Sequence, residues 1–175
     1  TKYHLFGDPA MKLYIPRNLA RVTEVNNSTD IESVEVGTST PINLAGKICL
    51  KNTENIDTEY NGTAKITLYD SDKYYMTQSV SGNNVDVYER GAELASVTCK
   101  VENGEWHTSI VIPEYLSGTT TIIPVMVTAI SEDGDVTNGF YKGLTLNRQL
   151  SGDINDDKAP VIGEMYINDK ATFAD

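Results

Sequence analysis

Apolar and polar residues alternate along most of this chain, a pattern typical of β-strands that bury one face. In the clearest run, residues 63–69, the apolar residues Ala64, Ile66 and Leu68 share one face. Other alternating runs occupy residues 11–15, 20–25, 31–36 and 42–51. No stretch repeats apolar residues at helical spacing over three turns. Together with two hairpins, the pattern predicts seven or eight strands packed as two antiparallel sheets.

The first hairpin is predicted around Asn103-Gly104, because both residues tolerate the positive φ that a type I′ turn requires. Counting outward from this turn pairs Glu102 with Glu105, Val101 with Trp106 and Cys99 with Thr108. Trp106 then shares a face with the apolar residues of the preceding strand. The pattern therefore predicts that Trp106 lies in the core.

The second hairpin is predicted over residues 122–146, with its turn at Asp133-Gly134. Pro124 has no N–H to donate, which places it at an edge or a bulge. One helical turn is expected at residues 113–116. Residues 147–160 are polar and indicate a linker, and residues 161–168 resemble the opening strand of another unit.

The net charge argues against two classes of partner, nucleic acids and anionic membranes. The chain has 175 residues, 14 Lys plus Arg against 25 Asp plus Glu, and a net charge of -11. Such a surface repels nucleic-acid phosphates and anionic membranes. No apolar run approaches the length of about 20 residues that a membrane span needs. The chain begins at Thr1 with no signal segment after it, so a targeting segment of a secreted parent is expected upstream.

The thiols and imidazoles are the first candidates for catalysis. The chain has two cysteines, Cys49 and Cys99, and two histidines, His4 and His107. Alternation points Cys99 into the core and His107 outward, so no thiol–imidazole dyad is expected from this pair. Cys49 alternates with lysines and is expected to face solvent, which disfavours a disulfide; two free thiols are the alternative.

Other binding chemistry is less specific. Asp153, Asn155, Asp157 and Glu164 have calcium-loop spacing, but Lys158 stands where glycine is needed. Acidic pairs suited to glycoside hydrolysis are not singled out by any pattern. Asn27-Ser28-Thr29 and Asn61-Gly62-Thr63 match the glycosylation pattern. A sugar-stacking platform or cross-strand packing would each use the same aromatic residues: Tyr69, Tyr74, Tyr75, Tyr88 and Trp106.

One segment resembles a known family. Leu5-Phe6-Gly7-Asp8-Pro9-Ala10-Met11-Lys12-Leu13 is similar to the segment that closes the catalytic domain of gingipain-type cysteine peptidases. Later segments follow in the order found after the protease in PorU-like members, the sortases of type IX secretion: residues 88–92 with 95–97, residues 101–106 with 112–113, and residues 157–162 with 166–169. The catalytic Cys and His of that family precede the Gly-Asp-Pro segment, and no position here matches them.

The resemblance implies an all-β, immunoglobulin-like antiparallel sandwich at residues 20–148. Residues 1–19 would be the end of the upstream peptidase domain. Their apolar side chains are expected to bury against the sandwich or against a missing partner: Leu5, Phe6, Met11, Leu13 and Ile15. Residues 149–175 would be a linker and the first strand of a following unit. It also implies a bacterium of the Bacteroidetes, export, and a cell-surface or outer-membrane setting.

We therefore expect a non-catalytic domain that supports and positions the upstream peptidase domain, its partner in the same chain, with secretion-system or surface proteins as further partners. We assign no catalytic, cofactor-binding or metal-binding residue and expect no cofactor. A surface adhesion or carbohydrate-binding module is the alternative, and a hydrolase that uses two carboxylates is the third possibility.

Overall fold

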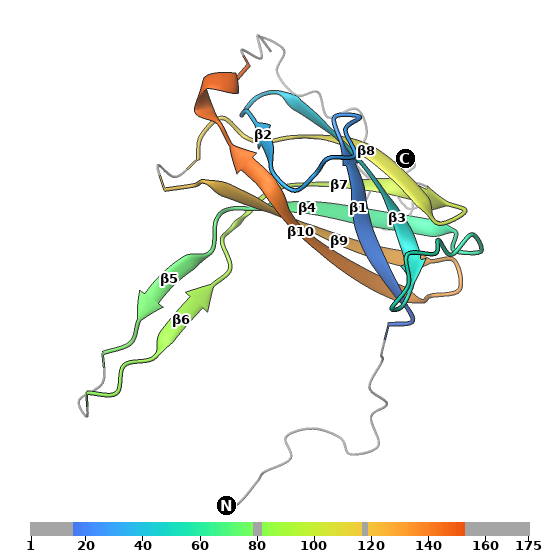
Figure 1. Cartoon of the computed structure of the whole chain (residues 1–175), viewed down its shortest axis with the longest axis horizontal. Coiled ribbons are helices and arrows are strands. Elements are labelled where there is room, and N and C mark those ends of the chain that lie inside the picture. Colours follow the sequence, from blue (N-terminus) through green and yellow to red (C-terminus); the bar gives the residue numbers. More distant parts are fainter. Residues whose placement is uncertain (1–15, 79–81, 117–118, 153–175) are drawn as a thin grey trace, which may run out of the picture.

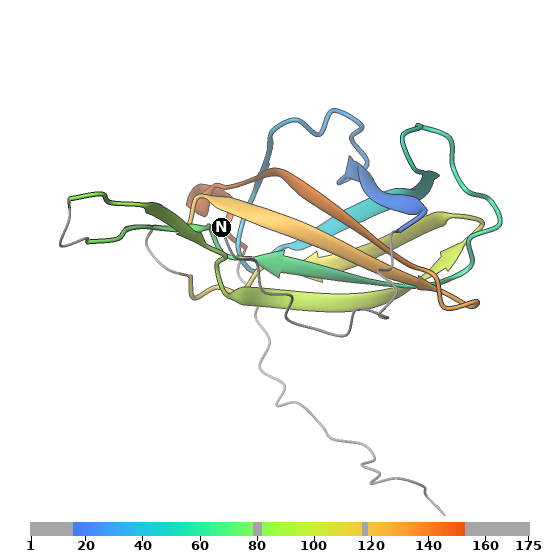
Figure 2. The ribbon, with the colours of Figure 1, turned by 90° about the horizontal axis from the view of Figure 1, so that it is seen from below.

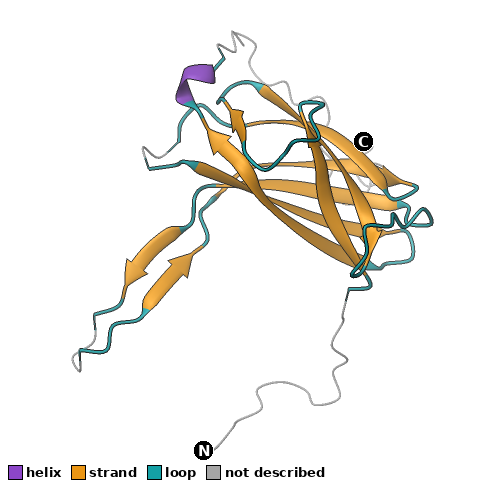
Figure 3. Cartoon of the chain, viewed as in Figure 1, coloured by secondary structure: helices purple, strands orange, loops and turns teal. Residues whose placement is uncertain are grey.

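The computed structural model describes residues 16–78, 82–116 and 119–152, and these residues form an all-β structure (Figures 1 and 3). Its elements, in chain order, are β1 (Asn18–Val25), β2 (Val34–Val36), β3 (Pro41–Leu50), β4 (Gly62–Tyr69), β5 (Lys73–Met76), β6 (Asp86–Glu89), β7 (Glu93–Glu102), β8 (Glu105–Val111), β9 (Ile122–Ser131), β10 (Val136–Leu146) and the 3₁₀ helix η1 (Arg148–Leu150).

Eight strands form one hydrogen-bonded sheet in the order β1-β3-β8-β7-β4-β9-β10-β2. The sheet folds over on itself between β8 and β7, so β1, β3 and β8 face β7, β4, β9 and β10 (Figure 2). At the far side the backbones of β1 and β10 meet, since a side chain on Gly139 would collide with the carbonyl of Ala20. Every pairing in this sheet is antiparallel except that of β2 with β10. The predicted all-β, immunoglobulin-like sandwich is confirmed.

The core lies between the two layers and is almost entirely aliphatic around one large aromatic residue. Trp106 is 1% exposed, as its predicted position in the core requires. Its indole packs on the bare backbone of Gly46 in the neighbouring strand β3, and a Cβ at Gly46 would clash with the ring and with the carbonyl of Arg21. The absence of a side chain at Gly46 is therefore what makes room for Trp106.

The Asn103-Gly104 turn forms as predicted. Both residues have positive φ, 51° and 75°, and Val101–Trp106 and Glu102–Glu105 pair across the hairpin. The predicted pairing of Cys99 with Thr108 is wrong. The ladder between β7 and β8 ends after Val101–Trp106, because β8 continues beside β3 in the other layer.

The second hairpin also forms, with Gly134 in its turn at φ 85°. Pro124 lies where the β9–β10 register shifts, between the pairs Tyr141–Val125 and Leu144–Ile123, so the expected bulge is confirmed. The helical turn expected at 113–116 is wrong, because these residues form an irregular connection. The short helix instead begins at Arg148, within the stretch expected to be a linker. The strands expected at 11–15 and 161–168 lie outside the described residues.

The close packing of Trp106 on Gly46 can be tested by Gly46→Ala. The added methyl group has no space, and we expect overpacking to lower the free energy of unfolding by about 1–3 kcal/mol. Urea unfolding followed by tryptophan fluorescence measures this change. Ser109→Ala, on the exposed face of β8, is the control and should change stability by less than about 0.5 kcal/mol. Equal stabilities for Gly46→Ala and the unmodified chain would contradict the packing.

Candidate functional site

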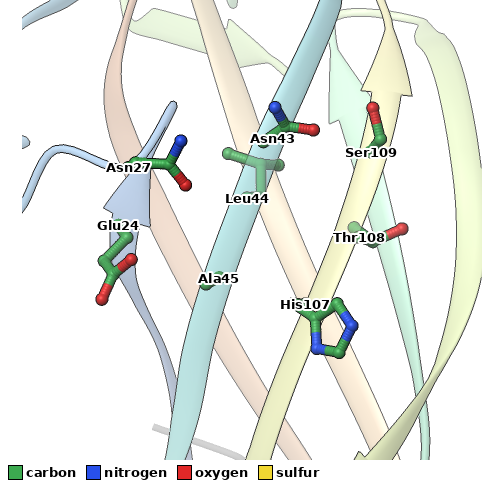
Figure 4. Close-up of a pocket in the computed structure, with 8 residues that line it drawn as sticks. All are labelled: Glu24, Asn27, Asn43, Leu44, Ala45, His107, Thr108 and Ser109. Atoms are coloured by element: carbon green, nitrogen blue, oxygen red, sulfur yellow. The ribbon is translucent and has the colours of Figure 1, made fainter.

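The outer face of the layer made by β1, β3 and β8 carries an open hollow of about 460 Å³ (Figure 4). Its polar lining comes from the end of β1, the turn after it, and the two neighbouring strands. The polar lining residues are Glu24, Asn27, Asn43, His107, Thr108 and Ser109. This hollow combines a concave surface with two ionisable side chains, Glu24 and His107, and with several hydrogen-bonding groups.

Glu24 reaches the hollow because β1 contains a bulge. The β1–β3 pairing passes from Val22–Gly46 directly to Glu24–Ala45, so Thr23 is the extra residue. A bulge changes which side chains face outward beyond it. Ala45 also pairs with His107 on β8. Glu24, Ala45 and His107 therefore form one row, with the small Ala45 between an acid and an imidazole whose Cα atoms are about 10 Å apart, twice the strand spacing.

The chemistry available in this hollow is hydrogen bonding to a polar ligand. Nucleophilic catalysis needs a nucleophile and a base within hydrogen-bond reach. Among the residues that the structure describes, no hydrogen bond or ion pair joins Glu24, His107 and Ser109 to one another. The hollow thus has donors and acceptors but not the paired arrangement that activates a hydroxyl.

Cys49 was expected to face solvent, and this prediction is wrong. Cys49 is 2% exposed, because the loop that follows β3 folds back across it. Ile56 bridges to Cys49, and the Cys49 thiol donates to the Glu54 carbonyl at 3.8 Å. An ion pair between Arg21 and Glu54, 3.0 Å long, holds the same loop to β1. Alternation predicted the correct face of β3, but it could not show the loop that covers this face.

Cys99 lies on the inner face of β7, where it packs half-buried against the core. His107 is exposed on the outer face of β8, next to Trp106 on the inner face. Both residues border an open depression beside the Asn103-Gly104 turn. Among the described residues, no hydrogen bond joins the Cys99 thiol to the His107 imidazole, so the two do not form a dyad in this depression. Both cysteines are free thiols.

Burial raises the pKa of both thiols. For Cys49 burial is the largest cause, partly offset by the nearby Arg21 guanidinium. For Cys99 burial is the cause. A reactive cysteine needs the opposite change, since the thiolate is the nucleophile and cationic surroundings lower its pKa. Neither thiol therefore has the electrostatic surroundings of a catalytic cysteine.

The five aromatic residues weighed as a sugar-stacking platform do not form one surface. Trp106 is buried. Tyr74 and Tyr88 face each other with ring centroids 5.4 Å apart and planes tilted by 52°, whereas Tyr75 pairs with Val87 on the other face of the ribbon. Tyr69 lies under the Arg90 guanidinium, 5.2 Å from the ring centroid. The aromatic platform is therefore not present as a coplanar row.

The second candidate surface is the ribbon formed by β5 and β6, which projects away from the sandwich (Figures 1 and 2). All eight of its strand residues are exposed. Its root is held firmly on the body. The Ser71 hydroxyl accepts from the N–H groups of Thr121 and Ile122 and donates to the Ile122 carbonyl, and Lys142 pairs with Asp72 at 3.3 Å.

On the other side of the root, Arg90 lies between two rings. Its guanidinium carbon is 5.2 Å from the centroid of Tyr69 and 5.8 Å from that of Phe140. The ammonium group of Lys142 also lies over the Phe140 ring, 5.2 Å from its centroid. Such cation–π contacts contribute about 0.5–1 kcal/mol each at exposed sites. The ribbon is therefore fixed in direction at its base.

Several expected features fall outside the described residues: His4, the apolar residues from Leu5 to Ile15, and the calcium-type loop at 153–164. Within the described ranges, no group of three or more His, Cys, Asp or Glu side chains could hold a metal ion. No helix in those ranges is both long and apolar enough to cross a membrane.

Sequence reasoning missed both the ribbon and the role of Glu24. A signal for the ribbon was present: two short β-prone stretches, Lys73–Met76 and Asp86–Glu89, flank the turn-forming residues Gly82, Asn83 and Asn84. No comparable signal marks Glu24. Its place in the hollow depends on the register of β1 against β3 and on the extra residue Thr23.

Comparison with solved structures supports the fold. The chain is similar to a dimeric latent PorU from Porphyromonas gingivalis, with a TM-score of 0.63 and 17% identity over 81% of this chain. The matched part is 14% of that PorU chain. The sporulation control protein Spo0M from Bacillus subtilis and a DUF4466 family protein from Parabacteroides merdae match with TM-scores of 0.40 and 0.41, at 8% and 11% identity over 75% and 77% of this chain and 50% and 46% of theirs. No protein-family model and no curated protein matches the sequence.

The raised thiol pKa values predict how stability varies with pH. A folded-state pKa above the unfolded value of about 8.5 means that the unfolded chain loses the thiol proton first as pH rises. The contribution of the thiol is thus fully present below that pH and declines as pH rises toward the folded pKa. We expect urea unfolding at pH 7, 8.5 and 10 to show a steeper decline for the unmodified chain than for Cys49→Ala. Parallel curves would contradict the burial of this thiol.

Proposed function

We propose that this chain is a non-catalytic, immunoglobulin-like domain of a gingipain-type, PorU-like cysteine peptidase. It supports and positions a catalytic domain that precedes it in the same polypeptide. The observation that carries the proposal is the match of 81% of this chain to 14% of a PorU chain at a TM-score of 0.63. That match has the extent of one domain within a much longer polypeptide.

The order of sequence segments supports the same assignment independently of the fold. The Gly7-Asp8-Pro9 segment precedes the sandwich, as it does at the end of the catalytic domain in gingipain-type peptidases. The residues around Arg90 and around the Asn103-Gly104 turn follow in the order of PorU-like members. Arg90 lies where the β5–β6 ribbon joins the sandwich, and the Asn103-Gly104 turn lies where the sheet folds over on itself.

The thiols support a non-catalytic role for this part of the polypeptide. Cys49 is covered by its own loop, and Cys99 packs half-buried against the core. In this proposal the catalytic Cys and His belong to the preceding domain. The same relation implies export and a place at the cell surface or outer membrane of a bacterium of the Bacteroidetes, where secretion-system or surface proteins would be further partners.

A carbohydrate-binding surface module is the second candidate, and the polar hollow at Glu24, Asn43 and His107 is the observation that favours it. It lacks the aromatic stacking surface usual for sugars. A glycan array separates the two candidates: a specific glycan whose binding is lost in Asn43→Ala and retained in Lys65→Ala, on the opposite layer, would favour the module.

The proposed function is tested first by the reading frame that precedes Thr1. We expect it to encode a caspase-like domain with its own Cys and His, and an unrelated domain there would overturn the proposal. The parent protein then provides the biochemical test. Cys49→Ser and Cys99→Ser should leave the rate of cleavage of a fluorogenic protein substrate unchanged, whereas Gly46→Ala should lower the thermal midpoint of the parent.

A loss of cleavage without a loss of thermal stability would contradict the proposal. If either cysteine variant abolished cleavage while retaining the thermal midpoint of the unmodified parent, the thiol would be part of the active site and this domain would be catalytic. Replacement of the cysteine in the preceding domain serves as the positive control for loss of activity.

A further inference from the structure

The layer of β1, β3 and β8 has one strand fewer than the layer of β7, β4, β9 and β10 that it faces (Figure 2). Among the described strands, none lies opposite β7, and its inward side chains show the effect. Val97 and Cys99 are only half-buried. Their direct partners on β4, Ile66 and Ala64, are fully buried. The core is therefore not closed over β7.

The facing margin of the shorter layer is a free strand edge. Beyond the short ladder with β7, β3 is the only described strand that pairs with β8. The Ile112 carbonyl accepts from the Ser39 N–H at 2.9 Å, on the side of β3. Because backbone groups alternate between the two sides of a strand, His107, Ser109 and Val111 point theirs away from β3. Such an edge is a template for one further strand.

An open depression of about 500 Å³ begins where β7 and β8 part, and both Cys99 and His107 border it. Neighbouring strands of a sheet lie about 4.8 Å apart. A strand added to the β8 edge would therefore lie over this depression and opposite β7. It would bond the free backbone groups of β8 and would also cover the half-buried Val97 and Cys99.

The part of the chain that the structure describes ends close to this edge. The Gly152 N–H donates to the Thr38 carbonyl at 3.0 Å. Ser39, the next residue after Thr38, is the one bonded to Ile112 just past the end of β8. The 23 residues from 153 to 175 therefore begin next to the end of the free edge.

We propose that residues 161–168 of the same chain form this further strand and close the sandwich. The linker at residues 153–160 can span about 26 Å, which exceeds the roughly 16 Å of the five-residue free edge. A segment that starts at the end of β8 and runs back along it is antiparallel to β8. The inference does not depend on the proposed function, and it assigns residues 161–168 to this sandwich rather than to a following unit.

The alternating pattern of the segment sets which face turns inward. Val161, Met165 and Ile167 share one face, whereas Glu164 and Asn168 lie on the other. The apolar face therefore covers β7. In an antiparallel pair, directly opposite residues have their side chains on the same face. The outward residue Glu164 is then opposite an outward residue of β8, so its N–H is directed at β8.

The alternating stretch at residues 11–15 does not reach the same edge. Only Pro16 and Arg17 link it to β1, and β3 and β8 lie between β1 and the added position. Three strand spacings are roughly 14 Å, whereas the Cα atoms of Ile15 and Asn18 are at most about 11 Å apart. Of the two terminal segments, only the one after Gly152 fits.

Amide hydrogen exchange in the 175-residue chain, followed by NMR, tests the added strand. The Ser109 N–H should exchange as slowly as that of Thr108, which bonds toward β3. Glu164→Pro removes an N–H directed at β8 and should speed exchange at Ser109 at least about tenfold. Thr108 should stay protected, which separates release of the strand from unfolding. Glu164→Ala keeps the N–H and is the matched control.

Cys99 provides a second readout, because the added strand covers it. Met165→Asp puts a charge on the inward face and should raise the rate of Cys99 alkylation by iodoacetamide at least about tenfold. Tyr166→Asp, on the outward face, is the control and should retain slow alkylation. Mass spectrometry of the peptides distinguishes Cys99 from Cys49.

Four outcomes would overturn the inference. Ser109 could exchange rapidly in the unmodified chain, or its slow exchange could persist in Glu164→Pro. Cys99 could be alkylated equally fast in Met165→Asp and Tyr166→Asp. Protection of Ser109 that increases with protein concentration would also contradict the closure, since the strand would then come from another molecule.

Discussion

Two residue pairs join β7 to β8, Val101–Trp106 and Glu102–Glu105, and this short ladder allows one sheet to form both layers of the sandwich. Beyond these pairs β8 runs beside β3 and β7 runs beside β4. Trp106 lies where the strands part, with its indole on the backbone of Gly46. A longer ladder would keep the sheet flat, and its apolar faces would then have nothing to enclose.

The turn at this point is bonded to the rest of the molecule as well as to itself. The N–H of Gly104 donates to the Tyr60 carbonyl at 2.8 Å, and the Gly104 carbonyl accepts from Ile48 at 2.7 Å. Tyr60 in turn donates its hydroxyl to the Asp135 carbonyl in the next hairpin. Three connections distant in sequence thus meet at one end of the sandwich and fix the place where it closes.

The parts of this fold that could be predicted are those in which a local sequence pattern specifies one backbone conformation. Alternation located the long strands because each buries a single face, and Asn103-Gly104 and Pro124 marked a turn and a bulge through their own backbone preferences. Alternation failed for Cys49, which a loop covers from outside, and for the ribbon, where both faces are exposed and no face is apolar alone.

The candidate site was less predictable for a related reason. Glu24, Ala45 and His107 become neighbours only through the register of three strands. The bulged residue Thr23 sets this register near the end of β1. The alternating pattern contains no sign of this extra residue. The pairing of the thiols was also left open by the sequence: alternation disfavoured a disulfide between Cys49 and Cys99 on the expectation that Cys49 faces solvent, and the structure shows two free thiols although Cys49 is buried.

The ribbon has a consequence for how the domain can vary among related chains. It leaves the sandwich after Tyr69 and returns before Glu93, which are themselves a bonded pair of β4 and β7. The chain therefore exits and re-enters at nearly one point, so the segment between can be lengthened, shortened or exchanged at little cost beyond that of closing a loop. The body thus acts as a stable frame on which this arm is a replaceable module.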